Sequence, residues 1–294
     1  MMNERDVRGV FVPVVTPFLP NGELDLDSYG SYAGKLMEQG IQGTVINGTT
    51  GESPTVSWEE VELLVEVTKE RMAGNRIPVI VGTGSNDTAA SVKLTELAGN
   101  LEADAALVVV PYYNRPSQEG IIEHFRAVAR VGVPVIVYEI PSRTGVTLTV
   151  DTARRIMELD GVIGLKDCSG GIGLVSELTR LGSKPVLCGE DEYFHAMLCA
   201  GASGGILASA NVNTGTFIEV FRHAEAGKYM KAKRTFDSLL PLIRLLFRES
   251  NPAPLKWLLT YRGLIASETV RLPMSPITEG LKLELECLLA RNFR

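Results

Sequence analysis

Eight short apolar runs rich in β-branched residues recur along the chain, each followed by a cluster of Gly, Pro or polar residues and then by a helical pattern. Several of these runs are apolar almost continuously, as is typical of strands buried on both faces of a parallel sheet. They predict strands over residues 9–15, 43–46, 78–81, 105–110, 134–137, 162–165, 185–187 and 205–207.

The segments between the predicted strands favour amphipathic helices. Ser57 and Glu60 have the spacing of a capping box at the start of one helix. Asp87 and Asp151 are placed to cap helices through residues 89–97 and 153–159. After residue 211 the alternation stops, and from residue 216 the pattern is mostly helical, with breaks near residues 251–254 and 272–274.

Strand followed by helix, repeated eight times, predicts a (β/α)₈ TIM barrel. We expect the barrel, with its active site, over residues 1–215 and a C-terminal helical extension over residues 216–294. An open doubly wound sheet is the alternative. It is weakened because the glycine-containing segment at residues 82–87 lacks the third glycine of a dinucleotide-binding fingerprint.

Composition and charge narrow the classes of partner. The net charge of −6 opposes a sequence-independent grip on nucleic acid or on anionic lipid, so small molecules are the expected partners. No apolar run approaches the roughly 20 residues of a membrane helix, and the charged N-terminus is unlike a signal peptide. We therefore expect a cytoplasmic protein. The four cysteines and three histidines show no metal-ligand spacing, so we expect no metal and no cofactor.

Lys166 ends an apolar run, where a strand bound for a buried sheet would not normally carry a charge. Burial lowers the pKa of a lysine, and a neutral amine can attack a carbonyl to form a Schiff base. A lysine at a strand end can also extend to solvent or pair with a carboxylate such as Asp167. The residues that follow the other strands are needed to choose between these interpretations.

Those residues suit carbonyl chemistry on a carboxylate substrate. Tyr138 is a candidate acid/base, and hydroxyls such as those of Thr49 and Tyr113 would help it, because a free tyrosine has a pKa of about 10. The turn containing Thr50 could cradle a carboxylate with its backbone N–H groups, and Arg143 offers a bidentate fork for a second one. Half-buried aromatics, a plain turn and a surface ion pair are the structural alternatives.

Four segments that follow predicted strands form a recognisable set: Gly48-Thr49-Thr50-Gly51-Glu52-Ser53, Pro111-Tyr112-Tyr113-Asn114, Tyr138 with Pro141-Ser142-Arg143-Thr144-Gly145, and Gly164-Leu165-Lys166. They resemble the dihydrodipicolinate synthase and N-acetylneuraminate lyase family, and the match spans nearly the whole chain. That family consists of pyruvate-dependent class I aldolase barrels, commonly homotetramers. The arginine at 143 and the tail residues 249–252, 256–257 and 272–278 resemble the synthase branch.

The resemblance implies that Lys166 forms an imine with pyruvate. Tyr138, Thr49 and Tyr113 would be the proton relay, with Tyr113 supplied by a neighbouring subunit. Thr49 and Thr50 would hold the carboxylate of pyruvate.

The same resemblance implies a second substrate, aspartate semialdehyde, whose carboxylate Arg143 would receive. Gly189 and Ile206 match positions that line the family's pocket through backbone groups. The product would be 4-hydroxy-tetrahydrodipicolinate, on the path to diaminopimelate and lysine.

Two positions depart from the family pattern. The residue after the tyrosine is usually Asn, and here it is Glu139, which strand alternation should point away from the side that Tyr138 faces. Lysine-inhibited synthases carry a histidine and a glutamate where this chain has Trp58 and Ala90. We therefore expect lysine feedback to be weak or absent.

Two other functions remain open from the sequence. One is a lyase of the same fold that acts on N-acetylneuraminate or a 2-keto-3-deoxy sugar acid. The other is a ligand-binding protein without catalysis. The joint presence of an amine and its proton relay disfavours the binding protein, because binding alone needs neither.

Overall fold

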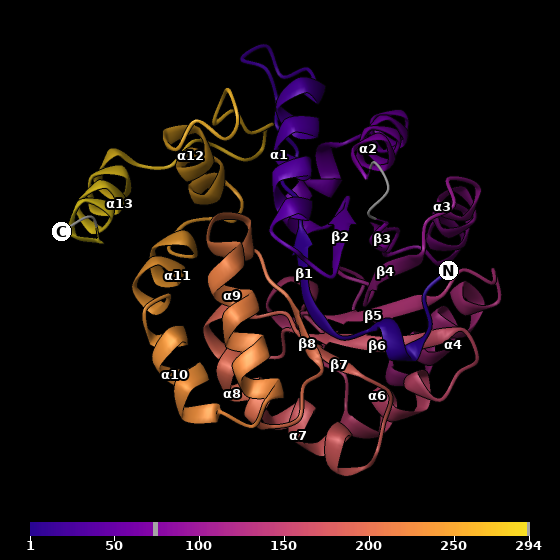
Figure 1. Cartoon of the computed structure of the whole chain (residues 1–294). Helices are drawn as coiled ribbons and strands as arrows, with labels where there is room; N and C mark the ends of the chain where they lie inside the picture. The colour runs from indigo at the N-terminus through magenta and orange to yellow at the C-terminus, as the bar shows by residue number, and fades with distance from the viewer. Residues whose placement is uncertain (73–75, 293–294) are drawn as a thin grey trace. The chain divides into compact units, whose positions relative to one another are not determined.

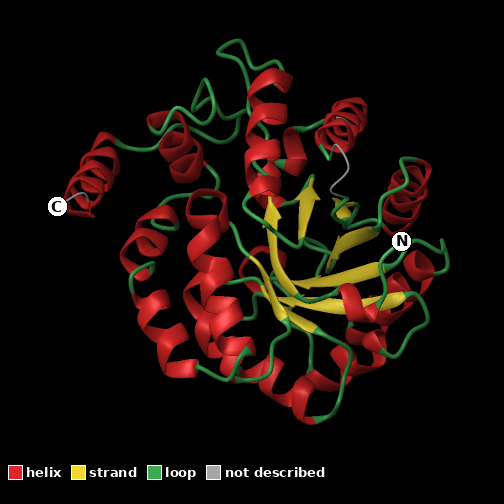
Figure 2. Ribbon diagram, in the orientation of Figure 1, coloured by secondary structure: helices red, strands yellow, loops and turns green. Residues whose placement is uncertain are grey.

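The computed structural model describes residues 1–72 and 76–292, and eight strands form a closed barrel in the order β1 to β8 (Figures 1 and 2). Pairing of Gly9 with Gly204 joins β8 to β1, so the barrel prediction is confirmed and the open sheet is wrong. The strands are β1 (Gly9–Pro13), β2 (Gly43–Ile46), β3 (Val79–Gly82), β4 (Ala105–Val109), β5 (Val135–Glu139), β6 (Val162–Asp167), β7 (Val186–Cys188) and β8 (Gly204–Ile206).

The chain comprises two compact units. Unit 1 holds residues 1–11, 42–45 and 78–207, and unit 2 holds residues 12–41, 46–77 and 208–294. The helices of unit 1 are α3 (Thr88–Asn100), α4 (Gln118–Ala129), α5 (Pro141–Thr144), α6 (Val150–Met157), α7 (Gly173–Arg180) and α8 (Phe194–Cys199). Those of unit 2 are α1 (Leu26–Glu38), α2 (Trp58–Arg71), α9 (Ala210–Glu225), α10 (Tyr229–Asp237), α11 (Leu240–Leu246), α12 (Ala253–Tyr261) and α13 (Glu279–Asn292).

The core of unit 1 is a cluster of side chains from all eight strands, in which Ile80, Leu107 and Leu187 are almost fully buried. In a continuous apolar run, one side chain points into the barrel and the next lies under a helix, so both faces of each strand are shielded from water. All eight predicted strands are present; β2 has the predicted ends, and the ends of the others differ by at most two residues.

In unit 2, α1 and α2 are joined by a buried hydrogen bond of 2.7 Å between the hydroxyls of Tyr29 and Thr68. The hydroxyl of Tyr32 in α1 donates to the side-chain oxygen of Asn211 in α9 at 2.7 Å. Buried tyrosines of this kind combine a large apolar contact with a satisfied polar end. These bonds connect segments that lie far apart in the sequence.

The predicted helix starts are right at two of three positions. Ser57 and Glu60 form the capping box of α2, and Asp87 accepts from the first N–H groups of α3. The predicted cap at Asp151 is wrong, because α6 begins earlier, at Val150. There the hydroxyl of Thr149 already accepts from the N–H of Thr152, and Asp151 lies in the first turn.

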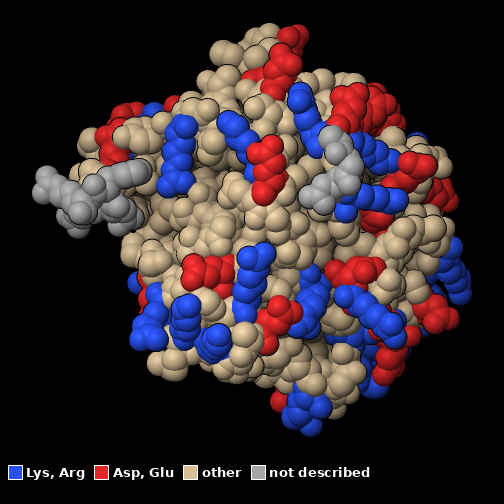
Figure 3. Space-filling model, viewed as in Figure 1, with Lys and Arg blue, Asp and Glu red and all other residues tan. Residues whose placement is uncertain are grey.

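Charged side chains pair along the surface helices. Arg154 pairs with Asp151 at 3.2 Å, and Lys233 pairs with Asp237 at 2.6 Å. Blue and red residues accordingly lie next to one another on the face shown in Figure 3. Among residues 1–72 and 76–292, no helix combines the length and the apolar character needed to cross a membrane.

Candidate active site

Lys166 and Tyr138 lie side by side on neighbouring strands. The register of β5 and β6 pairs Tyr138 with Lys166, and that of β6 and β7 pairs Lys166 with Leu187. The Lys166 Nζ is 4.0 Å from the centroid of the Tyr138 ring, and both side chains are buried. The amine of Lys166 therefore lies over the ring of Tyr138, the candidate acid/base.

The surroundings of Lys166 favour its neutral form. Burial lowers the pKa of Lys166, and the positive charge of Arg143 lowers it further, whereas the carboxylate of Asp191 raises it. The neighbouring thiol of Cys168 has a pKa raised by burial to about 12. It is therefore uncharged at neutral pH and supplies no counter-charge there. A lysine with a lowered pKa presents more of the nucleophilic amine at neutral pH.

Arg143 lies in α5, which follows β5 after a single residue, and its side chain is exposed. It is close enough to act electrostatically on Lys166. A guanidinium can receive a carboxylate in two parallel hydrogen bonds. The structure thus brings the predicted second carboxylate-binding residue near the amine.

Gly189 and Ile206 lie close to the same two side chains. A Cβ atom built on Gly189, just beyond β7, would be 2.7 Å from the Cε of Lys166. Only a residue without a side chain lets the backbone run this close to the lysine. Ile206, on β8, is 1% exposed and belongs to the core cluster that contains Tyr138.

Thr49 and Thr50 belong to unit 2, where they form the 3₁₀ turn Thr49–Gly51 after β2. Such a turn leaves its first N–H groups without partners in the turn itself, and these groups suit an anion. Thr50 is buried, and its Oγ1 accepts a hydrogen bond of 3.1 Å from the Nδ2 of Asn251. The sequence predicted no site role for Asn251. Its only signal was its place in a tail segment, residues 249–252, that resembles the family.

Tyr113 is placed differently from the other predicted catalytic residues. Its side chain is 88% exposed, and within the described part of the chain it makes no hydrogen bond or ring contact. Its φ of 71° lies in the left-handed region, which bulky residues rarely adopt. The structure therefore brings together Lys166, Tyr138, Arg143, Gly189 and Ile206 within unit 1, and it does not bring Tyr113 to them.

Glu139 faces away from Tyr138, as strand alternation predicts. It is fully buried, and its Oε1 accepts a hydrogen bond of 2.9 Å from the N–H of Leu148, in the loop that leads to α6. Burial raises the pKa of Glu139 to about 7, and the nearby carboxylate of Asp167 raises it as well. The departure from the family pattern thus places a titratable carboxyl behind the strand and outside the group around Lys166.

The described residues, 1–72 and 76–292, contain no group of three or more His, Cys, Asp or Glu side chains that could hold a metal ion. The arrangement around Lys166 has instead a buried amine, a phenol and a guanidinium. These groups are suited to imine formation with a keto acid.

Comparison with known proteins shows which family this chain resembles. The sequence profile of the Dihydrodipicolinate synthetase family matches residues 6–292. The chain is 39% identical over 282 residues to 4-hydroxy-tetrahydrodipicolinate synthase 2 of Clostridium acetobutylicum, covering 95% of this chain and 98% of that protein. It is 41% identical over 280 residues to the 4-hydroxy-tetrahydrodipicolinate synthase of Nitrosospira multiformis, covering 94% of this chain and 93% of that protein.

A solved structure agrees with these relatives. The chloride-inhibited dihydrodipicolinate synthase from Acinetobacter baumannii, complexed with pyruvate, matches with a TM-score of 0.93 and 38% identity. The match covers 97% of this chain and 98% of that one. Sequence and fold agree over nearly the full length, and this chain belongs to the dihydrodipicolinate synthetase family.

Proposed function

We propose that this chain condenses pyruvate with L-aspartate 4-semialdehyde to form 4-hydroxy-tetrahydrodipicolinate, on the path to diaminopimelate and lysine. The observation that carries the proposal is the contact between Lys166, buried with a lowered pKa, and Tyr138. Two relatives that are synthases of this product, and the Acinetobacter baumannii relative complexed with pyruvate, support it.

The neutral amine of Lys166 attacks the ketone carbon of pyruvate, and the resulting carbinolamine loses water to give an imine. Loss of a proton from the methyl group gives an enamine, whose carbon attacks the aldehyde. The amine of the second substrate then displaces Lys166 and closes the ring. Each step moves a proton, and Tyr138, whose ring centroid lies 4.0 Å from the reacting nitrogen, is the proposed acid/base.

The remaining site residues take the roles that the family resemblance gives them. Thr49 and Tyr113 complete the proton relay, with Tyr113 supplied by a neighbouring subunit of a homotetramer. Thr49 and Thr50 hold the carboxylate of pyruvate. Gly189 and Ile206 line the pocket. The reaction takes place in the cytoplasm, and residues 216–294 form a helical extension of the barrel.

Arg143 decides the choice of aldehyde. It is the exposed cation near Lys166, and a carboxylated aldehyde gains a bidentate ion pair there. A coupled assay with aspartate semialdehyde should give turnover. Incubation with N-acetylneuraminate or a 2-keto-3-deoxy sugar acid should release no pyruvate. Turnover only with a sugar acid would make the protein a lyase of the same fold.

Borohydride reduction tests the nucleophile. Reduction in the presence of pyruvate should add the mass of the reduced pyruvate adduct to the peptide that contains Lys166. The peptide with Lys184, a half-buried lysine whose Nζ donates to the Val162 carbonyl, should remain unmodified. An unmodified Lys166 peptide would overturn the aldolase mechanism.

A further inference from the structure

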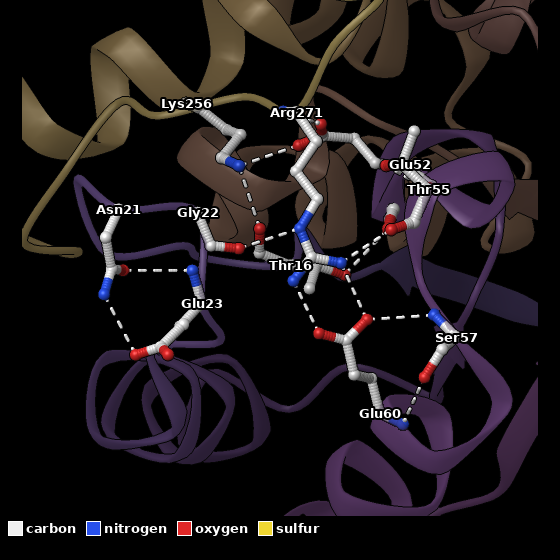
Figure 4. A network of polar contacts seen from close by, with 11 residues as sticks. Thr16, Asn21, Gly22, Glu23, Glu52, Thr55, Ser57, Glu60, Lys256 and Arg271 are labelled. Atoms are coloured by element: carbon white, nitrogen blue, oxygen red, sulfur yellow. Dashed lines mark hydrogen bonds and ion pairs between the residues drawn. The ribbon is translucent and has the colours of Figure 1, made fainter.

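A hydrogen-bond network in unit 2 joins the C-terminal segment, through Lys256 and Arg271, to Glu52 (Figure 4). Glu52 ends the turn that carries Thr49 and Thr50. The turn is closed locally, because the N–H of Gly51 donates to the Gly48 carbonyl at 3.0 Å. The N–H of Glu52 donates likewise to the Thr49 carbonyl at 3.1 Å. These local bonds shape the turn, and the side chain of Glu52 links it to the rest of the unit.

Glu52 and Lys256 form a buried ion pair. The Nζ of Lys256 donates to Glu52 Oε1 at 2.7 Å and to the carbonyl of Thr16 at 2.9 Å, and it lies 4.2 Å from the centroid of the Phe18 ring. The Lys256 side chain is 0% exposed and that of Glu52 is 2% exposed. Breaking such a pair on one side leaves an uncompensated buried charge, so the pair fixes the two segments firmly.

Arg271 satisfies the second oxygen of the same carboxylate. Its backbone N–H donates to Glu52 Oε2 at 3.1 Å. Its guanidinium donates to the carbonyls of Gly22 and Thr55, at 2.8 and 2.6 Å, and pairs with both carboxylate oxygens of Glu60. In Figure 4, Lys256 and Arg271 approach the Glu52 side chain from the C-terminal segment. The end of the turn is therefore held at both carboxylate oxygens of Glu52.

Asn251 acts on the turn more directly. Its Nδ2 donates to the Oγ1 of Thr50 at 3.1 Å. A hydroxyl oxygen that accepts from one side keeps its own hydrogen free to donate in another direction. Asn251 therefore leaves the Thr50 hydroxyl as a donor and restricts where its hydrogen can point. A donor hydroxyl beside free N–H groups is the arrangement that a carboxylate needs.

We propose that Asn251 is a positioning residue for the substrate carboxylate, which orients the Thr50 hydroxyl as a donor while the Glu52–Lys256–Arg271 network holds the turn. The C-terminal segment is on this view part of the carboxylate site. The inference rests on the proposed function, in which the turn binds the carboxylate of pyruvate.

The first test compares Asn251→Ala and Asn251→Asp with Ser250→Ala, an exposed neighbour whose side chain makes no hydrogen bond in the described part of the chain. Asn251→Ala should raise the KM for pyruvate about tenfold, because the Thr50 hydroxyl is no longer oriented to donate a charge-assisted hydrogen bond to the substrate carboxylate. The kcat and the KM for the aldehyde should stay at the native values, since the lost contact is the same in ground and transition states. Ser250→Ala should match the native protein.

Asn251→Asp should raise the KM for pyruvate further. An aspartate accepts from the Thr50 hydroxyl, turns its hydrogen away and places a negative charge beside the substrate carboxylate. A native KM for pyruvate in both Asn251 variants would overturn the proposal. If native protein itself forms no imine with pyruvate, the proposed function fails first. If the native protein forms the imine but both Asn251 variants keep the native KM for pyruvate, only the positioning role is ruled out.

The second test separates positioning from folding. Lys256→Met leaves the buried carboxylate of Glu52 without its ion-pair partner, so it should lower the thermal midpoint and raise the KM for pyruvate. Lys256→Met combined with Glu52→Gln removes both charges and should recover most of the thermal midpoint. The KM for pyruvate should stay raised in the double variant, because the turn is no longer held by the lysine. A double variant that binds pyruvate like the native protein would show that the network serves folding only.

Discussion

Glu139 is a buried acid one residue away from Tyr138, at a register position that pairs with Asp167. Its Oε1 is held by the N–H of Leu148, whereas its Oε2 is buried without a hydrogen-bond partner in the described structure. Burying a neutral carboxyl costs less free energy than burying a carboxylate, and the pKa of Glu139, about 7, reflects this difference. Lys166 and Tyr138 thus lie close to a group that titrates near neutral pH.

We expect Glu139 to make folding depend on pH. The folded pKa of about 7 is above the unfolded value of 4.5, so the folded state holds a proton that the unfolded state has lost. This contribution is fully present below pH 4.5 and is lost as the pH rises through 7. Relative to Glu139→Gln, the free energy of unfolding should fall by about 3 kcal/mol across that range.

Urea unfolding of native and Glu139→Gln protein at several pH values between 4.5 and 8 measures this difference. Glu123→Gln, the same substitution at an exposed glutamate, is the control. Native and Glu139→Gln profiles that run parallel across the range would contradict the prediction.

At the scale of elements, the start of α2 links local and tertiary interactions through one carboxylate. Glu60 accepts from the N–H of Ser57 at 2.9 Å, which completes the capping box. The same side chain pairs with Arg271, and both partners of that pair are 21% exposed. The helix start is therefore set by its own sequence and is also tied to a residue more than two hundred positions away.

Substitutions in the capping box should have unequal costs. Ser57→Ala removes one cap and should lower the free energy of unfolding by about 1 kcal/mol. Glu60→Ala should cost more, because it removes a cap and also leaves the half-buried guanidinium of Arg271 without its bidentate partner. Urea unfolding measures both, with Glu66→Ala on the exposed face of α2 as the control. An equal cost for the two capping variants would contradict the coupling.

At the scale of the whole molecule, Tyr113 stands apart from Tyr138, the other member of the proposed proton relay in unit 1. The side chain of Tyr113 is 88% exposed, and its hydroxyl has no partner in the described residues of its own chain. Its backbone is in the left-handed conformation. A strained, exposed aromatic is an unusual feature unless another surface covers it. The proposed homotetramer supplies such a surface.

Hybrid oligomers test whether Tyr113 serves a neighbour. Tyr113→Phe and Lys166→Ala should each be nearly inactive when pure, because each removes a group of the proposed mechanism. Co-expression with two different tags, followed by purification on both, yields mixed oligomers. These should regain activity, since a site with an intact Lys166 can receive Tyr113 from the other subunit. Inactive mixed oligomers would place Tyr113 outside the neighbouring site.

The sequence was sufficient for the barrel and for most of the site in unit 1. Buried strands of a parallel sheet leave continuous apolar runs, and barrel chemistry lies just beyond strand ends, so Lys166, Tyr138 and Arg143 could be found from their positions alone. The start of α6 was missed because Thr149 and Asp151 are both good caps, and only the helix itself decides between them. The boundary at residue 215 stays a prediction.

The sequence by itself determined the order of the strands, the amine at the end of β6 and the family, because these depend on local pattern and chemistry. Only the tertiary structure decided that the Lys166 amine lies over the Tyr138 ring and that Glu139 is buried with a raised pKa. It also brought Asn251 to Thr50 and Lys256 to Glu52. Contacts across two hundred residues depend on how helices pack, and no local pattern encodes which polar side chains meet there.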